Sequence, residues 1–400
     1  MTLKLKFEAV TDPEVIRFTH IENGSVWSSR FLSQEEYADR EWVLGQSDLG
    51  QLHRSQEHID KYDSNAVYLG LKYFVLKDVS LPETSKTSQI VASCETMNRT
   101  GWAMLPGDST GQIHEVLVAC IGGVFTLKHH RGRGYARRMI ELLNEYYDSL
   151  AQNSEEPFLK HLAVHLYSEI GEYYAKNGYV SYHVPLYELH NLDGLQEHYC
   201  EKYSCDNETT ITANDIRYLG YDDYEDLVEL QKQHFKKQLL QAHDACGGSR
   251  FIFTVQPSLK IYKWFEDRDL FLYKKFREEK PTRFGAALAD GSHIVWHHSW
   301  TSGTLILLKV QIMGEDQEKK LALLLKECIQ EARSSDITHL EFWQDELPGE
   351  KFPIFHSTIR ALEPGSNLEK INSSLSAVRA AQGEFRGEIL WLNNTKFCWF

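Results

Sequence analysis

The stretch Arg131-Gly132-Arg133-Gly134-Tyr135-Ala136 lies between a strand-like run and an amphipathic helix, and the fold is decided there. The run from Ile113 to Leu127 is rich in Val, Ile and Phe, which predicts a strand. The run from Tyr135 to Leu150 changes period, and its apolar stripe at i, i+3, i+4 and i+7 consists of Ala136, Met139, Ile140 and Leu143. The six residues therefore form a turn at a helix N-terminus, where free N–H groups and the helix dipole attract anions.

The glycines of this turn favour a phosphate-bearing ligand. Gly132 and Gly134 allow close approach of a ligand and backbone angles closed to other residues, so a pyrophosphate is the natural guest. Arg131 and Arg133 add positive charge to the turn, although either is equally compatible with a solvated surface residue. The spacing matches neither the dinucleotide fingerprint G-x-G-x-x-G with its later acidic residue nor the Gly-Lys-Ser/Thr of a P-loop.

The pattern [Q/R]-x-x-G-x-[G/A], present as Arg131, Gly134 and Ala136, resembles the coenzyme A signature of the GNAT acetyltransferase superfamily. The preceding 123–126, Gly-Val-Phe-Thr, is similar to the V-[YF]-T of that family, whereas Leu127 and Lys128 replace its prolines. The resemblance implies an α+β GNAT fold with a mixed central sheet, and acetyl-CoA as co-substrate without a metal. It also implies these cofactor-binding residues: Val124, Phe125 and Thr126 for the pantetheine arm and acyl carbonyl, and Arg131, Gly132, Arg133, Gly134, Tyr135 and Ala136 for the phosphates.

A second family element follows about forty residues later, where 168–179 is similar to the helix Y-x-x-x-G-[FY]. Ser168 can cap this short helix and Gly178 can end it. The resemblance assigns to Tyr174 the protonation of the departing thiolate. A phenol suits that role, because its unperturbed pKa of about 10 keeps it protonated at neutral pH. The alternative for Tyr174 is an aromatic core residue, which is the favoured interpretation for Tyr173.

The general base that deprotonates the attacking amine is not identified by the sequence. The candidates are Glu115 near the start of the predicted cofactor strand, Glu95 on the preceding strand and His165 on the following one. A chain of water molecules is an alternative to all three, so the base stays unassigned.

Composition narrows the class of protein and of partner. The 400 residues exceed what one hydrophobic core usually organises, and their formal charge of −14 opposes nucleic-acid binding. Seven cysteines without a C-x-x-C pair suit a reducing compartment. With neither a signal peptide nor a run of about 18 apolar residues, we expect a soluble, cytoplasmic protein without membrane contact, and nuclear entry stays open.

The second half repeats the order of several strands, a helix and a strand, which suggests a divergent duplication. A polar stretch predicts the boundary, with a catalytic GNAT domain at 1–205 and a GNAT-like domain at 206–400 that lacks the cofactor motif and closes the substrate pocket. Among the strands that the sequence predicts are one in the first half, at Leu159 to Tyr167, and one in the second half, at Leu270 to Lys274. Residues of the second half that are candidates for the amine site are Asp345, Glu346, Trp300, Trp343 and Phe400.

The two-domain layout, with FLSQEEYADRE at 31–41 and the aromatic end LNNTKFCWF at 392–400, resembles the fungal lysine N6-acetyltransferase family. That resemblance implies acetyl transfer to the side-chain amine of free lysine in lysine degradation. A protein N-acetyltransferase and a non-catalytic acyl-CoA-binding or scaffold protein remain alternatives, and the oligomeric state is open. The pairs His129-His130 and His297-His298 do not indicate a metal site, because neighbouring strand residues point to opposite faces.

Overall fold

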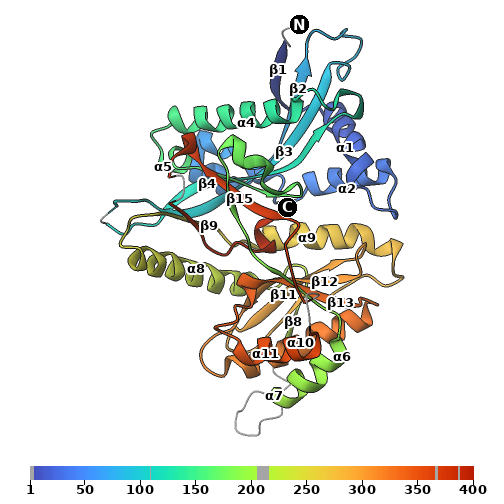
Figure 1. Cartoon of the computed structure of the whole chain (residues 1–400), viewed down its shortest axis with the longest axis vertical. Coiled ribbons are helices and arrows are strands. Elements are labelled where there is room, and N and C mark those ends of the chain that lie inside the picture. The colour runs from blue at the N-terminus through green and yellow to red at the C-terminus, as the bar shows by residue number, and fades with distance from the viewer. Residues whose placement is uncertain (1–3, 109, 205–215, 365–367, 386–387) are drawn as a thin grey trace.

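Two mixed β-sheets with helices packed around them follow one another along the long axis of the molecule (Figure 1). The computed structural model describes residues 4–108, 110–204, 216–364, 368–385 and 388–400. The mixed sheets and their helices confirm the predicted α+β class. Within the described ranges, no helix is long and apolar enough to cross a membrane.

The first sheet has the strand order β1-β2-β3-β4-β5-β15-β6, and β9 and β16 extend it from β3. Neighbours are antiparallel except β4 with β5 and β16 with β9. A parallel pair needs a long crossover, which helix α4 supplies between β4 and β5. The strands of this sheet are β1 (Leu5–Val10), β2 (Gly70–Asp78), β3 (Ile90–Met104), β4 (His114–Thr126), β5 (Ala163–Ser168), β6 (Val180–Tyr182), β9 (Phe251–Val255), β15 (Leu375–Ala380) and β16 (Ile389–Trp391).

The second sheet has the order β14-β7-β13-β12-β11-β10-β8. It repeats the arrangement of β4, α4 and β5, because α10 crosses between the parallel strands β12 and β13. The turn before α10 reads Gly314-Glu315-Asp316, so it lacks the arginines and carries acid instead. The strands are β7 (Leu186–Leu189), β8 (Arg217–Leu219), β10 (Gly285–Ala287), β11 (His293–Ser299), β12 (Thr304–Gln311), β13 (His339–Trp343) and β14 (Glu369–Lys370).

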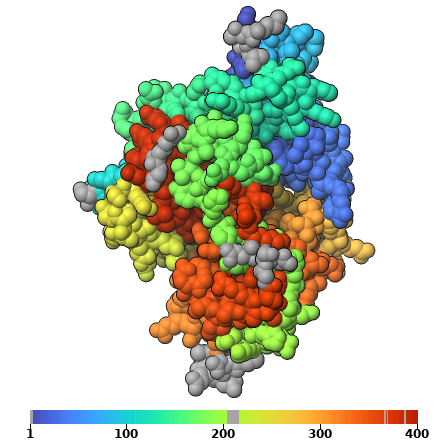
Figure 2. All heavy atoms as spheres, viewed as in Figure 1, coloured from blue at the N-terminus to red at the C-terminus, as the bar shows by residue number. Residues whose placement is uncertain are grey.

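Each sheet takes strands from both halves of the chain. Strand β7 joins the second sheet between β13 and β14, whereas β15 enters the first sheet between β5 and β6. Figure 2 shows the consequence on the surface, where atoms from the end of the chain lie among those of the N-terminal half. The predicted boundary at residue 205 falls at 205–215, outside the described residues.

Helices cover the sheets and provide the apolar stripes that the sequence predicts. On α4, Met139, Ile140 and Leu143 are fully buried, and burial of each such side chain contributes about 1.5–3 kcal/mol. Ser33 begins α2 with a complete capping box to Glu36. The helices are α1 (Pro13–Trp27), α2 (Gln34–Gly45), α3 (Gln56–Tyr62), α4 (Tyr135–Gln152), α5 (Pro157–Lys160), α6 (Leu192–Leu195), α7 (Lys202–Ser204), α8 (Glu225–Ala245), α9 (Leu259–Leu272), α10 (Gln317–Ser334) and α11 (Pro353–Leu362).

Two strand predictions are corrected. The run Leu270 to Lys274 ends helix α9 and continues as a 3-10 turn, because its apolar residues extend the helical stripe of Ile261 and Phe265. The predicted strand Leu159 to Tyr167 begins only at Ala163, since the residues before it form α5 with Pro157 at its first position.

Candidate active site

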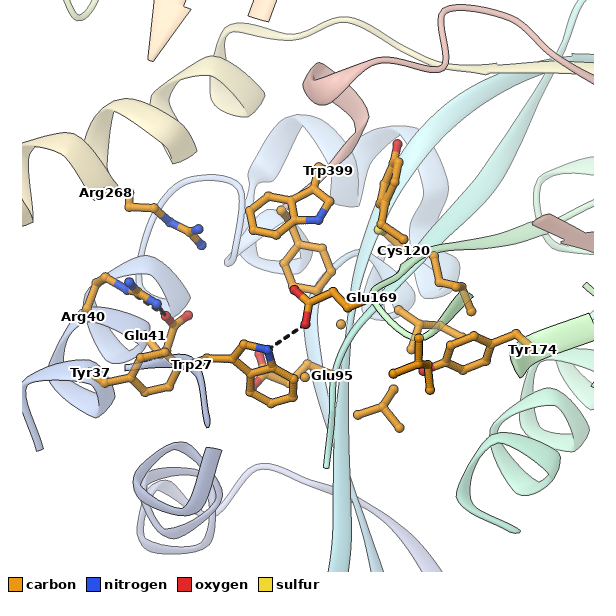
Figure 3. A pocket seen from close by; sticks show the side chains of 18 residues that line it. Trp27, Tyr37, Arg40, Glu41, Glu95, Cys120, Glu169, Tyr174, Arg268 and Trp399 are labelled. Atoms are coloured by element: carbon orange, nitrogen blue, oxygen red, sulfur yellow. Dashed lines mark hydrogen bonds and ion pairs between the residues drawn. The ribbon is translucent and has the colours of Figure 1, made fainter. Parts of the chain in front are cut away.

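A cavity of about 320 Å³ opens beside the first sheet, between β4, β5 and helices α1, α2 and α9 (Figure 3). Small-molecule sites usually span about 300–1,000 Å³, so the volume suits a small substrate. The lining residues are Trp27, Tyr37, Arg40, Glu41, Glu95, Cys120, Ile121, Gly122, Gly123, Val124, Leu166, Tyr167, Glu169, Ile170, Tyr174, Arg268, Trp399 and Phe400.

The cavity exists because β4 and β5 diverge. Their parallel pairing runs from Val118 to Ile121 of β4 and then stops, although β4 continues to Thr126. Immediately beyond that point, two residues of β4 oppose one residue of β3, which is a β-bulge. Gly123 takes the positive φ of 57° that this bulge requires. The backbone from Gly122 to Val124 is thereby turned into the cavity wall.

The predicted phosphate turn follows β4 and leads directly into α4. Gly132 and Gly134 have φ of 77° and 81°, and a Cβ added to either would meet no atom within 4 Å, so this backbone is open to a ligand. No side chain caps α4, which leaves its first N–H groups available. Arg131 and Arg133 are exposed, whereas Tyr135 is buried and its hydroxyl donates to Asp78 Oδ2 at 2.7 Å.

The predicted cofactor residues lie on the end of β4, the following turn and the first turn of α4, and only some of them line the cavity. Val124 lines the cavity. Phe125 is buried behind it, with its ring centroid 6.0 Å from that of Trp27, and Arg131 donates to the Thr126 carbonyl at 3.2 Å. Ala136 is half-buried in the first turn of α4.

Tyr174 lies on the 3-10 helix Gly171–Asn177 and faces the cavity on the side of β4 (Figure 3). The helix ends at Gly178 in the left-handed conformation, as predicted. The prediction that Ser168 caps its start is wrong, because Ile170 is the N-cap and the Ser168 hydroxyl accepts from the N–H of Ile170 and donates to the Gly171 carbonyl instead. Burial raises the pKa of Tyr174 well above its ordinary value, so the phenol keeps its proton. Tyr173 does not line the cavity and packs against the Tyr174 ring.

Of the three base candidates, Glu95 is the one that lines the cavity. Its Oε1 accepts from Nε2 of the buried His20 at 2.9 Å and lies 3.5 Å from the position a Cβ of Gly123 would occupy. Burial opposes protonation of His20, but the Glu95 carboxylate outweighs it and the pKa of His20 is raised. Glu115 instead bonds Lys61 and Tyr62, and His165 is fully buried beside Arg99.

The far end of the cavity is charged, and no sequence motif indicates this. Arg40 and Glu41 of α2 form an ion pair there, and Arg268 reaches in from α9 (Figure 3). The Arg268 guanidinium lies over the ring of Trp399, 5.2 Å from its centroid. These groups meet because α2 and α9 pack together, a tertiary contact that no local pattern encodes.

Of the second-half residues considered for the amine site, Phe400 lines the cavity, with its ring packed over Gly122, where a Cβ would approach within 2.6 Å. The other four do not line it. Glu346 is buried against Lys309, 3.0 Å away, and the Trp300 indole donates to the Asp269 carbonyl at 3.1 Å. The part of the chain that the structure describes holds no group of three His, Cys, Asp or Glu side chains placed to bind a metal ion.

Comparison with known proteins gives matches over the whole chain. Residues 202–400 match the family model described as the LYC1 GNAT-like C-terminal domain. A Saccharomyces cerevisiae protein, described as uncharacterized protein YGR111W, is 44% identical over 99% of this chain and 98% of its own length. A Yarrowia lipolytica protein named lysine acetyltransferase is 22% identical over 86% of this chain and 85% of its own length.

Among solved structures, a GCN5-related N-acetyltransferase from Kribbella flavida matches with a TM-score of 0.50 and 14% identity, over 94% of this chain and 72% of that one. At this identity the likeness concerns the fold alone. Together with the family model and the two fungal relatives, it shows that the chain belongs to the GNAT acetyltransferases and resembles the fungal lysine acetyltransferase.

Proposed function

We propose that this acetyltransferase transfers the acetyl group of acetyl-CoA directly to the amine of a small molecule, and that its acceptor is the N6 amine of free L-lysine. The observation that carries the proposal is that Glu95 and Tyr174 line the same cavity, at the point where β4 leaves β5. A base and an acid that share one small cavity suit a reaction in which one proton must be removed and another supplied.

The residues around the phosphate turn fit acetyl-CoA. The uncapped N-terminus of α4 and the open backbone at Gly132 and Gly134 suit a pyrophosphate, and the exposed Arg131 and Arg133 add positive charge. In this proposal the strand Val124 to Thr126 binds the pantetheine arm, whose thioester then enters the cavity beside the bulge. Acetyl-CoA supplies the activated acetyl group, and the residues of this chain position it and move the protons.

Each proton in the transfer has a donor and an acceptor. Glu95 accepts a proton from the acceptor ammonium, and the free amine nitrogen forms a bond to the acetyl carbon. The carbon–sulfur bond breaks, and Tyr174 donates its proton to the departing thiolate. The second proton of the new amide nitrogen passes through solvent to the Tyr174 phenolate, and Glu95 releases its own proton to solvent. His20 holds the Glu95 carboxylate in position through the 2.9 Å contact.

Direct attack is favoured over a covalent acetyl-cysteine step. Cys120 also lines the cavity, but burial raises the pKa of its thiol to about 12, so it is not a thiolate at neutral pH. A thiol without its thiolate form is a poor nucleophile.

We also propose that residues 1–205 provide the acetyl-CoA site and that residues 206–400 close the substrate pocket. Arg268, Trp399 and Phe400 support this division of roles, because they come from the second half and line a cavity built on the first sheet. Free lysine is supported by the name of the Yarrowia relative and by the small volume of the cavity.

The test is thiol release from acetyl-CoA with L-lysine, with a lysine-containing peptide and without an amine, followed by mass spectrometry of the products. We expect lysine-dependent release that yields N6-acetyllysine, and a fall in kcat of about 100-fold for Tyr174→Phe, a size typical of a lost general acid. Tyr173→Phe is the matched control, because that neighbour lies outside the cavity lining, and it should keep the wild-type rate.

Two results would change the assignment. Acetylation of the peptide but not of lysine would make the chain a protein N-acetyltransferase. Calorimetric binding of acetyl-CoA without release to any amine would make it a binding module.

A further inference from the structure

Arg268 carries a positive charge that nothing else in the cavity neutralises directly. It makes no hydrogen bond or ion pair with any residue that the structure describes, and its buried Nε has no partner atom. Burial and the nearby Arg40 lower the pKa of Arg268 to about 10, which still leaves it protonated at neutral pH. A buried cationic donor without a partner is costly, so its retention points to a ligand.

The carboxylates nearest to Arg268 are already engaged. Glu41 forms its ion pair with Arg40, and these two charges cancel. Asp269, the next residue on α9, accepts from the backbone N–H of His298 at 2.8 Å, and His297 Nδ1 lies 2.5 Å from its other oxygen. The Trp399 ring holds the guanidinium by cation–π contact while leaving its N–H groups free to donate in its plane.

The end of the cavity nearer the β4 bulge, where acetyl transfer is proposed, carries acidic side chains, in contrast to the arginines at the far end. Glu95 lies beside the β4 bulge, and Glu169 accepts from the Trp27 indole at 3.3 Å between that point and the arginines (Figure 3). Figure 3 shows Arg40 and Arg268 on one side of the cavity and Tyr174 on the other. The two ends therefore suit an ammonium and a carboxylate that are separated within one small molecule.

We propose that Arg268 binds the carboxylate of the acceptor and thereby makes the enzyme specific for free amino acids whose reacting amine is on the side chain. The inference rests on the proposed function and adds the residue that selects the substrate. A guanidinium can donate two parallel hydrogen bonds to a carboxylate, which fixes the direction of the bound molecule. A lysine within a peptide has no carboxylate at that place, so the same arginine disfavours protein substrates.

The experiment compares L-lysine with cadaverine, which has the same chain and amine but no carboxylate. We expect the wild type to prefer lysine, and Arg268→Gln to lower kcat/KM for lysine about 100-fold, mainly through KM, as for loss of a charge-assisted pair. For cadaverine, kcat/KM of Arg268→Gln should stay within about threefold of the wild-type value. Cadaverine has no carboxylate to pair with Arg268, so it loses little when the guanidinium is removed. Arg268→Lys keeps the charge without the fork and should restore part of the loss.

The matched control is Arg217→Gln on β8, which removes the same charge from an arginine paired with Asp226 outside the cavity. It should leave both substrates unaffected. Equal losses for lysine and cadaverine in Arg268→Gln, or a lysine-specific loss in Arg217→Gln, would overturn the assignment of Arg268.

A binding measurement separates this inference from the proposed function. L-lysine is titrated by calorimetry into wild type and Arg268→Gln, each saturated with coenzyme A, which carries no acetyl group to transfer. If the wild type acetylates no amine but binds lysine through Arg268, the proposed function fails and the inference holds. If lysine binds equally to both proteins, or to neither, the inference fails whatever the turnover.

Discussion

The Glu95 carboxylate has two close neighbours, His20 and Gly123. His20 approaches it from α1, and Gly123 lies against it at the bulge, where an added Cβ would be 3.5 Å from Glu95 Oε1. Because one oxygen is occupied by His20, the second is the one available to an incoming amine. The contact with His20 thus fixes which carboxylate oxygen of Glu95 can accept the proton, as well as where the carboxylate lies.

Replacement of Glu95 by Gln should lower kcat by about 100-fold or more, because an amide cannot take the proton of the acceptor ammonium. The deficit should shrink as the pH approaches about 10, where a lysine side chain loses its proton without assistance. The measurement is kcat for L-lysine from pH 7 to 10. Glu115→Gln is the control, since that carboxylate bonds Lys61 and Tyr62 outside the cavity, and a similar loss there would refute the assignment.

Tyr174 and Arg268 show how far single residues can be predicted from sequence. Tyr174 is recognisable because Gly178, four residues later, fixes its register on a short helix. Arg268 has no such mark. Its significance depends on the packing of α9 against α2 and on the ring of Trp399, and these contacts join segments that are far apart in the chain.

Among elements, the turn before α4 combines backbone strain with an open face. Gly134 is the N-cap of α4 and has a φ of 81°, where an L-residue with a Cβ is disfavoured by about 1–2 kcal/mol. The same residue presents the first N–H groups of the helix to a ligand. Stability and cofactor affinity are therefore coupled at this position.

Gly134→Ala should lower the free energy of unfolding by about 1 kcal/mol and weaken acetyl-CoA binding, because the turn shifts to relieve the strain. Gly107→Ala is a closely matched control, with a φ of 76° and no atom near an added Cβ. It should show the same loss of stability in denaturant unfolding with unchanged acetyl-CoA affinity by calorimetry. Equal affinities for the two variants would exclude this turn as the phosphate site.

A buried network joins α9, β11 and α10. His298 lies 3.1 Å from Asp269 through Nδ1 and 3.0 Å from Glu331 through Nε2. Burial alone would lower its pKa, but these two carboxylates raise the pKa of His298 to about 9. Since the folded state holds the proton more tightly than the unfolded chain, this group stabilises the fold fully below pH 6.5 and loses that contribution as the pH rises through 9.

The free energy of unfolding should therefore fall by about 3 kcal/mol between pH 6 and pH 10 through this group, because raising a pKa by one is worth about 1.4 kcal/mol. Denaturant unfolding of the wild type and His298→Gln at both pH values measures it as the change in their difference. His183→Gln, at an exposed histidine, should show no such change. A wild-type advantage that stays constant with pH would mean that His298 is not protonated in the fold.

Elements with a clear period are predictable, and those defined by distant partners are not. The stripes of α4 and α10 appear in the sequence at 3.6-residue spacing and are buried as expected. The run from Leu270 to Lys274, at the end of α9 and in the 3-10 turn after it, resembles a strand because a run of five residues is too short to distinguish a helical from a strand period. The helical period becomes clear only when the preceding turns of α9 are included. The exchange of β7 and β15 between sheets leaves no local mark, since strand sequences do not specify their partners.

At the scale of the whole molecule, the two halves complete each other. Strand β15 pairs with β5 over six residues and with β6 over three, so it fills the position between them. On the other side of the same sheet, β9 pairs with the end of β3, and β16 pairs with β9. Arg379 of β15 also forms a two-pronged ion pair with Asp148 of α4, at 2.7 and 2.6 Å.

A fragment of residues 1–204 should accordingly fail to fold alone, although it contains every residue of the predicted cofactor site. Without β15, both β5 and β6 present unpaired edges, and the buried side chains of Leu375, Ala377 and Val378 are missing from the sheet. We expect aggregation or an absence of cooperative unfolding by circular dichroism, and recovery of soluble material and lysine-dependent thiol release when residues 216–400 are co-expressed. A fragment that unfolds cooperatively and binds acetyl-CoA would instead show that the first sheet is autonomous and that β15 only reinforces it.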